Sequence, residues 1–149
     1  MAVPRRTAQG LDAGRLSILV AVLDRRARIS LTGHDVFAAT AAGVRLTEPA
    51  ADLAVCLALV SAARDRQVPA NLATFGEVGL GGEVRPVPQL PRRLAEASRL
   101  GFRRALVPAA GQPASLARDA VGLELIPVVS VAETLAVLVE PASDPLEVR

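Results

Sequence analysis

Residues Phe75 to Leu90 read FGEVGLGGEVRPVPQL, and this stretch decides how the rest of the chain is organised. A strand runs into a corner with four glycines in seven residues, continues as a second short strand and stops at prolines. Glycine accepts positive φ and close backbone approach, which a bulged hairpin beside another element requires. The corner is not a phosphate loop, because Glu83-Val84 stands where a Walker loop needs Lys and Ser or Thr. Pro86 and Pro88 also block the helix that a GxGxxG turn must open.

Three segments of the chain occur in an order that is typical of one family. They are Thr47–Ala54 (TEPAADLA), Phe75–Val87 and Leu100–Pro108 (LGFRRALVP). In this order they resemble the Lon-protease-like domain, in the version at the C-terminal end of RadA-type bacterial recombination proteins, and the resemblance covers most of the chain. It implies an α/β (α+β) fold of the Lon-protease-like, ribosomal-protein-S5-like type, with a mixed sheet and packed helices.

Composition indicates a single globular domain of 149 residues, 51% hydrophobic and 21% charged. No apolar run approaches the roughly 20 residues that span a bilayer, and the N-terminus does not resemble a signal peptide. The single cysteine excludes an internal disulfide. We therefore expect a cytoplasmic location and no membrane partner.

All 17 basic residues are arginine. The absence of lysine excludes the Ser-Lys dyad, the Walker lysine and Schiff-base chemistry, and one His with no Tyr leaves few acid–base groups. Without residues 140–149 the chain has 16 Arg and 12 acidic residues, so its net charge rises from +2 to +4. A basic body with an acidic tail is compatible with nucleic acid or an acidic partner surface.

Hydrophobic periodicity, glycines and prolines predict the secondary structure, with residues 1–10 as a leading strand or linker, 11–140 as the domain and 141–149 as a disordered tail. Ser130 and Glu133 are expected to form a capping box, and Thr47 or Glu48 to cap the second helix. The predicted elements are a helix at 11–28, a two-strand hairpin at 35–46, a buried helix at 49–64, strands at 72–78 and 84–85, a helix at 90–100, a strand at 104–107, a short helix at 115–120, a strand at 123–128 and a helix at 130–139.

Because the resemblance is to a protease family, it suggests peptidase activity, but the residues at the aligned catalytic positions argue against it. Active Lon-family members have a serine in a Gly-Pro-Ser-Ala-Gly turn that opens the central helix, and a lysine after a Pro-Ile-Gly-Gly-Leu segment. Aligned on Pro49, the serine position holds Ala50; aligned on Pro86, the lysine position holds Pro91. Since neither nucleophile nor base remains, we predict no peptidase activity, and a residual serine peptidase is only the third alternative.

Cys56 and His34 form the one other possible pair of nucleophile and base. Cys56 lies inside an apolar helix, where a buried thiol is normally inert, so a core cysteine and a loop histidine are expected. One His and one Cys are also too few for a zinc site, and we expect no metal or cofactor in this chain.

Arginines gather after the glycine corner. Two interpretations of these arginines have equal weight. One is a solvated face with ion pairs to Glu77, Glu83 and Glu96. The other is a nucleic-acid surface, which the resemblance favours because RadA-type proteins act on branched DNA. The lack of Trp and Tyr argues against base stacking and leaves phosphate contacts. The candidate DNA-binding residues are Arg85, Arg92, Arg93, Arg99, Arg103 and Arg104, with Arg5 and Arg6 if the leading segment packs nearby.

The resemblance implies a role in homologous recombination as a non-catalytic part of a hexameric ATPase that binds single-stranded or branched DNA. The alternative is a pure oligomerisation scaffold without DNA contact. A Walker loop, zinc-finger cysteines and the family's Lys-Asn-Arg-Phe-Gly motif are absent from this sequence. ATP, magnesium and zinc are therefore expected only in other parts of a longer protein.

Overall fold

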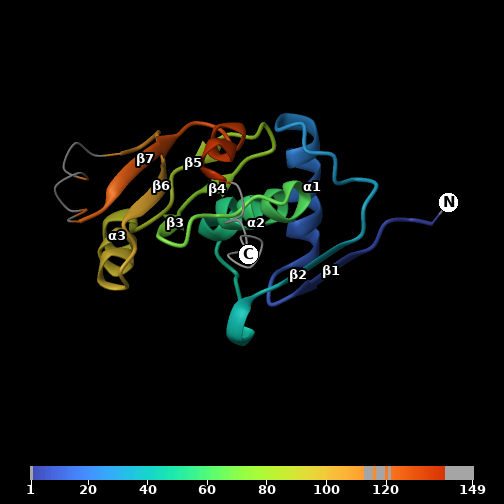
Figure 1. Ribbon diagram of the computed structural model, residues 1–149, viewed down its shortest axis with the longest axis horizontal. Coiled ribbons are helices and arrows are strands. Elements are labelled where there is room, and N and C mark those ends of the chain that lie inside the picture. The colour runs from blue at the N-terminus through green and yellow to red at the C-terminus, as the bar shows by residue number, and fades with distance from the viewer. Residues whose placement is uncertain (1, 113–115, 117–119, 121, 140–149) are drawn as a thin grey trace, which may run out of the picture.

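The computed structural model describes residues 2–112, 116, 120 and 122–139 and has a mixed α/β architecture (Figure 1), which confirms the predicted fold class. Within these residues, three short 3-10 helices lie at Ala41–Gly43, Pro49–Ala51 and Ala132–Val137. The helices and strands are β1 (Arg6–Gln9), α1 (Ala13–Arg26), β2 (Val36–Ala39), α2 (Asp52–Arg64), β3 (Leu72–Thr74), β4 (Glu77–Val78), β5 (Val84–Arg85), α3 (Leu90–Arg99), β6 (Arg104–Pro108) and β7 (Glu124–Val128).

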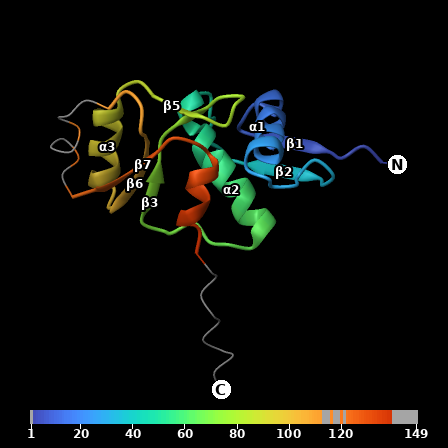
Figure 2. The same ribbon diagram turned by 90° about the horizontal axis from the view of Figure 1, so that it is seen from above.

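The strands of the described residues form three small sheets. β1 and β2 pair in parallel, β3, β6 and β7 form a parallel sheet in the order β3-β6-β7, and β4 and β5 form an antiparallel pair. Figure 2 shows α2 between the β3-β6-β7 sheet on one side and α1 with the β1–β2 pair on the other. The two parallel sheets therefore lie at opposite ends of the molecule.

The core has two parts, one on each face of the β3-β6-β7 sheet. The apolar side chains of α1 recur at helical spacing at Leu16, Leu19 and Leu23, and they pack on the apolar helix α2 in the larger cluster. β6 alternates between the two clusters, since Leu106 belongs to the larger one, and Ala105 and Val107 to the smaller one beneath α3. This sheet therefore carries α2 on one face and α3 on the other.

The helices predicted at 11–28, 49–64 and 90–100 are confirmed. The Asp12 side chain caps α1 by accepting a 2.7 Å hydrogen bond from the Arg15 backbone N–H. α2 follows a 3-10 turn that has Pro49 at its start, but neither Thr47 nor Glu48 makes a side-chain cap there. Gly101 follows α3 with φ +94, as expected for the residue after a helix.

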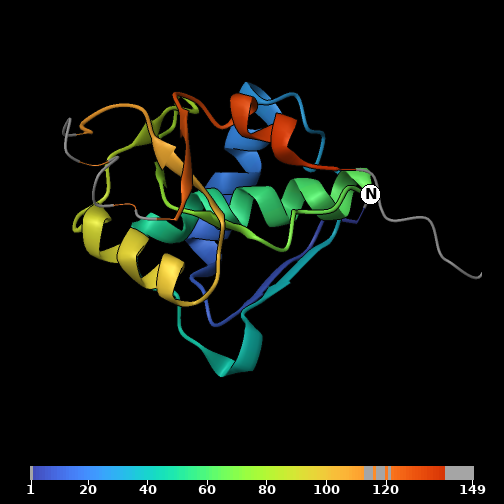
Figure 3. The same ribbon diagram turned by 60° about the vertical axis from the view of Figure 1, so that its left-hand side comes forward.

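The predicted hairpin at 35–46 is wrong. β2 pairs in parallel with β1, and the chain then leaves the sheet and returns at Leu46, which forms a parallel bridge with Leu11. Residues 41 to 49 are all exposed, and Figure 3 shows this loop extending away from the body. The leading segment is therefore a strand: residues 6–9 form β1, which pairs with β2 in place of the second hairpin strand that was predicted.

Two further segments differ from the prediction. The strand predicted at 72–78 is interrupted at Phe75-Gly76, so that β3 and β4 belong to different sheets. The helix predicted at 130–139 is a 3-10 helix without a capping box, because Ser130 pairs with Glu83 and the Glu133 side chain accepts from the Val129 N–H.

Other predictions fall outside what the structure describes. The short helix at 115–120 lies mostly beyond the described residues, and so does the tail at 141–149. Among the helices of the described residues, none has the length and apolar character needed to cross a bilayer.

Candidate nucleic-acid interface

The two positions aligned with the protease dyad carry no catalytic group. Ala50 is buried in the turn before α2, where its carbonyl accepts a 3.1 Å hydrogen bond from the Gly76 N–H. Pro91 lies exposed in the first turn of α3, where proline is favourable because its missing N–H would have no helical partner. A methyl group and a pyrrolidine ring can neither attack a carbonyl nor accept a proton.

Asp52 is a buried charged residue that no motif in the sequence marks as part of a site. Its side chain is 5% exposed and accepts hydrogen bonds from Arg15 Nε at 3.0 Å and from the Val78 N–H at 3.1 Å. Arg15 Nη2 also donates to Asp52 and, at 3.0 Å, to the Val78 carbonyl. The hydrogen bond to Asp52 raises the pKa of the Arg15 guanidinium, although burial opposes this. These hydrogen bonds join α1, α2 and β4, and Asp52 neutralises the charge of Arg15 within the fold.

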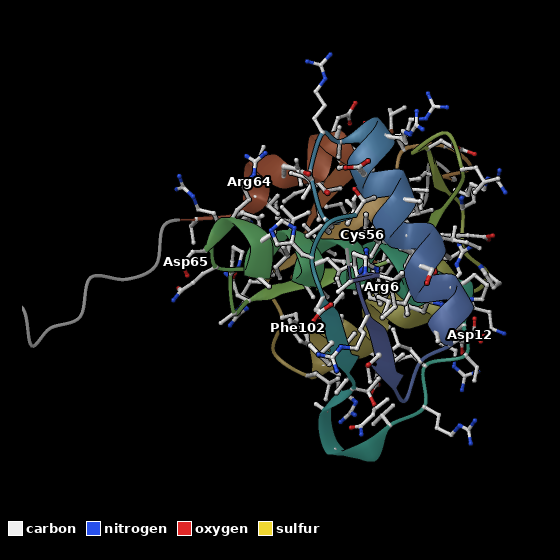
Figure 4. All side chains as sticks on the ribbon, turned by 90° about the vertical axis from the view of Figure 1, so that its right-hand side faces the viewer. Arg6, Asp12, Cys56, Arg64, Asp65 and Phe102 are labelled. Atoms are coloured by element: carbon white, nitrogen blue, oxygen red, sulfur yellow. The ribbon has the colours of Figure 1, made fainter. Side chains whose placement is uncertain are left out.

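Cys56 and His34 do not form a catalytic pair. Cys56, labelled in Figure 4, is fully buried in the larger cluster, and burial raises the pKa of its thiol to about 12. His34 is exposed in the turn before β2, and no hydrogen bond joins it to Cys56. The thiol is therefore protonated and inert at neutral pH.

Arg5 and Arg6 do not join the other candidate arginines. They lie on or next to β1, at the opposite end of the molecule from α3 (Figure 1). Arg6 Nη2 donates to the carbonyls of Leu31 and Thr32 at 3.2 and 3.1 Å, so its side chain ties β1 to the loop before β2. Arg5 lies 3.6 Å from Asp35 and is mostly exposed.

Four of the remaining six candidates are paired with carboxylates. The hydrogen bond from Arg99 lowers the pKa of the Glu96 carboxyl and raises the pKa of Arg99 itself. A hydrogen bond to its own backbone N–H, and then the hydrogen bonds from Arg85, lower the pKa of Glu83. The four ion pairs are Arg85–Glu83 at 2.7 Å, Arg93–Glu48 at 2.5 Å, Arg99–Glu96 at 2.5 Å and Arg104–Glu124 at 3.9 Å.

Arg92 and Arg103 are the two candidates with neither an ion pair nor a side-chain hydrogen bond among the described residues. Arg92 is exposed on α3, and Arg103 is exposed in the turn that leads into β6. Other exposed arginines share this property within the described part of the chain, but they are not among the predicted DNA-binding residues, since their only signal in the sequence is a position at a helix end or in a loop. They are Arg25, Arg26, Arg28, Arg45 and Arg64.

A cavity of about 480 Å³ opens beside α3 and brings two candidate arginines together with two aromatic rings. Arg92 and Arg93 line it from α3, Phe102 from the residues that follow α3, and Phe75 from the end of β3. The remaining lining residues are Glu48, Ala73, Gln89, Glu96, Ala97 and Leu100. The described residues contain no group of three or more His, Cys, Asp or Glu that could hold a metal ion.

Residues 17–140 match the family described as the Lon protease (S16) C-terminal proteolytic domain. The chain is also similar to bacterial proteins named DNA repair protein RadA. It is 54% identical to that of Salmonella typhimurium over 113 residues, which is 76% of this chain and 25% of the relative. For Haemophilus influenzae the identity is 44% over 138 residues, 93% of this chain and 30% of the relative.

The RadA protein of Synechocystis is 43% identical over 143 residues, which is 96% of this chain and 27% of the relative. The chain thus spans between a quarter and a third of the length of these relatives.

Proposed function

Because the chain belongs to the family of Lon protease C-terminal domains and is similar to RadA proteins named for DNA repair, we propose that it is a DNA-binding accessory domain without peptidase activity. It contacts the phosphate backbone of single-stranded or branched DNA during homologous recombination. ATP hydrolysis, with its magnesium, and zinc binding belong to other parts of a longer RadA-type protein, which assembles as a hexameric ring in the cytoplasm.

The observation that carries this proposal is the pair of exposed arginines without a carboxylate partner at one end of the molecule, Arg92 and Arg103. A guanidinium that is not neutralised within the protein can replace counterions on DNA phosphates, and the release of those counterions drives binding. Arg99 adds a further cation on α3 and Arg85 another on β5, since their ion pairs are exposed and such pairs contribute little to stability. Their guanidinium groups can therefore exchange a carboxylate for a phosphate.

Peptidase activity has no support in the residues at the aligned positions. Ala50 and Pro91 offer no nucleophile and no base, and the sequence has no lysine that could substitute. The one cysteine is buried with a raised thiol pKa. The proposed role therefore depends on charge and shape.

Substitution of the two unpaired arginines tests the proposal. Fluorescence anisotropy would measure the affinity of the 149-residue chain for a labelled single strand across a series of salt concentrations. The Arg92→Gln/Arg103→Gln variant should weaken binding, and each substitution should lower the slope of log affinity against log salt by about 0.7. Arg28→Gln is the matched control, because Arg28 is an exposed arginine without a carboxylate partner among the described residues that follows α1, away from α3. An unchanged affinity and slope in the double variant would contradict the proposal.

A second candidate function is an assembly scaffold without DNA contact. It is favoured by the β1–β2 pair, whose strands pair only with each other among the described residues, and by Phe37, which is 67% exposed on β2. Unpaired strand edges with apolar side chains are sites of association between chains. Light scattering on the same samples separates the candidates, because a scaffold forms an oligomer whose mass does not respond to DNA.

A further inference from the structure

We infer that the cavity beside α3 is a stacking site for one base of single-stranded DNA, with Phe75 and Phe102 as its aromatic platform and Arg92 as a phosphate ligand at its rim. The inference rests on the proposed DNA binding and adds a mode of recognition to it. It also reverses the expectation, drawn from the lack of Trp and Tyr, that bases are not stacked.

The cavity has a size that suits a planar ring. Its volume of about 480 Å³ lies within the range of roughly 300–1,000 Å³ that is common for small-molecule sites. It runs along β3, which pairs with β6 and with no other strand among the described residues. Ala73 and Ala97 are small lining residues, so they leave room between α3 and the strand.

The aromatic rings of the chain are concentrated at this cavity. The sequence has three phenylalanines and no Trp or Tyr, and two of the three line the cavity. Phe75 and Phe102 are partly exposed, and Phe75 also packs against the smaller hydrophobic cluster. Rings held in this way by the core can present their free surface to a base.

The end of α3 fixes the position of Phe102. Gly101 takes a left-handed conformation with φ +94, and the Phe102 N–H then donates to the Ala97 carbonyl at 3.1 Å. This hydrogen bond is the one that closes a Schellman motif, which turns the chain back against the last turn of the helix. Phe102 is thus placed at the cavity by backbone geometry.

The charges around the cavity favour an anionic ligand. Glu48 and Glu96 line it, but Arg93 and Arg99 respectively neutralise them within the protein. Arg92 makes no ion pair or hydrogen bond to a carboxylate among the described residues, although, after the hydrogen bond from Arg99, its charge also helps to lower the pKa of the Glu96 carboxyl. A base in the cavity would therefore have an unpaired guanidinium within reach of its flanking phosphate.

The geometry favours single-stranded over duplex DNA. A base can enter a cavity against an aromatic ring only when it has left its own stack, and a single strand meets that condition at the lowest energetic cost. Stacking is also tolerant of sequence, because every base has a flat π face.

The test separates stacking from phosphate binding by using two oligonucleotides with the same number of phosphates. One is 20 thymidines and the other is 20 abasic sites, and anisotropy would measure the affinity of the full chain for each. Phe75→Leu and Phe102→Leu should each weaken thymidine binding by about tenfold and leave abasic binding unchanged. Phe37→Leu is the matched control, since Phe37 lies on β2 at the opposite end of the molecule. It should change neither affinity.

A second variant keeps the test independent of any loss of stability in the leucine variants. Phe102→Trp introduces the one indole of the chain, and its fluorescence should be quenched by the thymidine oligonucleotide and not by the abasic one. Equal wild-type affinity for both oligonucleotides, or an indole that does not respond to thymidine, overturns the stacking site and leaves phosphate binding intact. Binding to neither oligonucleotide overturns the proposed function itself, and the stacking site with it.

Discussion

At the scale of single residues, the ion pair between Asp52 and Arg15 could not be predicted from the sequence. A carboxylate in the first turn of an apolar helix was visible in the sequence, but its partner Arg15 lies 37 residues earlier. The ion-pair partners of the candidate arginines could not be predicted for the same reason, because pairs such as Arg93–Glu48 join residues that are 45 positions apart in the sequence. Composition predicted an arginine-rich surface, but not which guanidinium groups are already neutralised.

Removal of Arg15 should leave the Asp52 carboxylate buried with the Val78 N–H as its remaining donor. Arg15→Met is therefore expected to lower the free energy of unfolding by about 3 kcal/mol, because an unpaired buried charge costs more than the pair contributed. Urea denaturation followed by circular dichroism would measure the difference.

The control for this prediction is Arg25→Met, which removes an exposed arginine without an ion pair from the same helix and should change stability by less than about 0.5 kcal/mol. Equal stability of the Arg15 and Arg25 variants would show that the buried group does not stabilise the fold.

At the scale of elements, the glycine corner behaves as its sequence predicted, and for two separate reasons. Gly82 has φ +81, a conformation that other residues adopt at a cost. Gly76 has no such backbone requirement, but a Cβ at this position would lie 2.7 Å from Val84 Cγ1 and 3.2 Å from Leu53 Cδ2. The corner therefore lets β4 and β5 approach α2 closely.

Gly76→Ala should destabilise the protein by about 1–3 kcal/mol, because the added methyl group overfills the contact with Leu53 and Val84. Gly33→Ala is the matched control, since a Cβ there meets nothing within 4 Å and should change stability by less than about 0.5 kcal/mol. Thermal unfolding of the two variants would measure the difference, and similar melting temperatures would argue against close packing at the corner.

The elements also show where prediction from sequence ends. The three α-helices were predictable, because helical periodicity is a local signal and α1 and α2 bury the faces that it marks. The hairpin at 35–46 failed because β2 takes its partner from residues 6–9, and strand pairing over such a separation leaves no local trace. The Phe75–Phe102 cavity was missed for the same reason, since its walls are distant in sequence.

At the scale of the whole molecule, the two clusters divide the structure into unequal layers. The larger cluster joins α1 and α2 to one face of the β3-β6-β7 sheet, and the smaller one holds α3 to the other face. Leu90, Leu94 and Ala97 are the residues of α3 that are buried. A layer held by few buried side chains opens at a lower free energy than the rest.

Native-state hydrogen exchange should therefore show weaker protection in α3 than in α2, by about tenfold or more. Mass spectrometry of peptides from the two helices would give the exchange rates at a pH and temperature at which the protein is folded. Single-stranded DNA should slow exchange in α3 if the proposed interface lies there. Identical protection in the two helices would mean that both layers open only in global unfolding.

The parallel pairing of β1 with β2 has a consequence for biosynthesis. Arg6 faces Val36 across the ladder, so β1 leaves the ribosome well before its partner has been translated. In the β3-β6-β7 sheet, β3 likewise cannot pair until β6 has been translated, and β6 cannot pair with β7 until β7 has been translated. A topology built from distant contacts acquires native structure slowly, and β1, the first strand of its pair to be synthesised, is a natural client for chaperones during that interval.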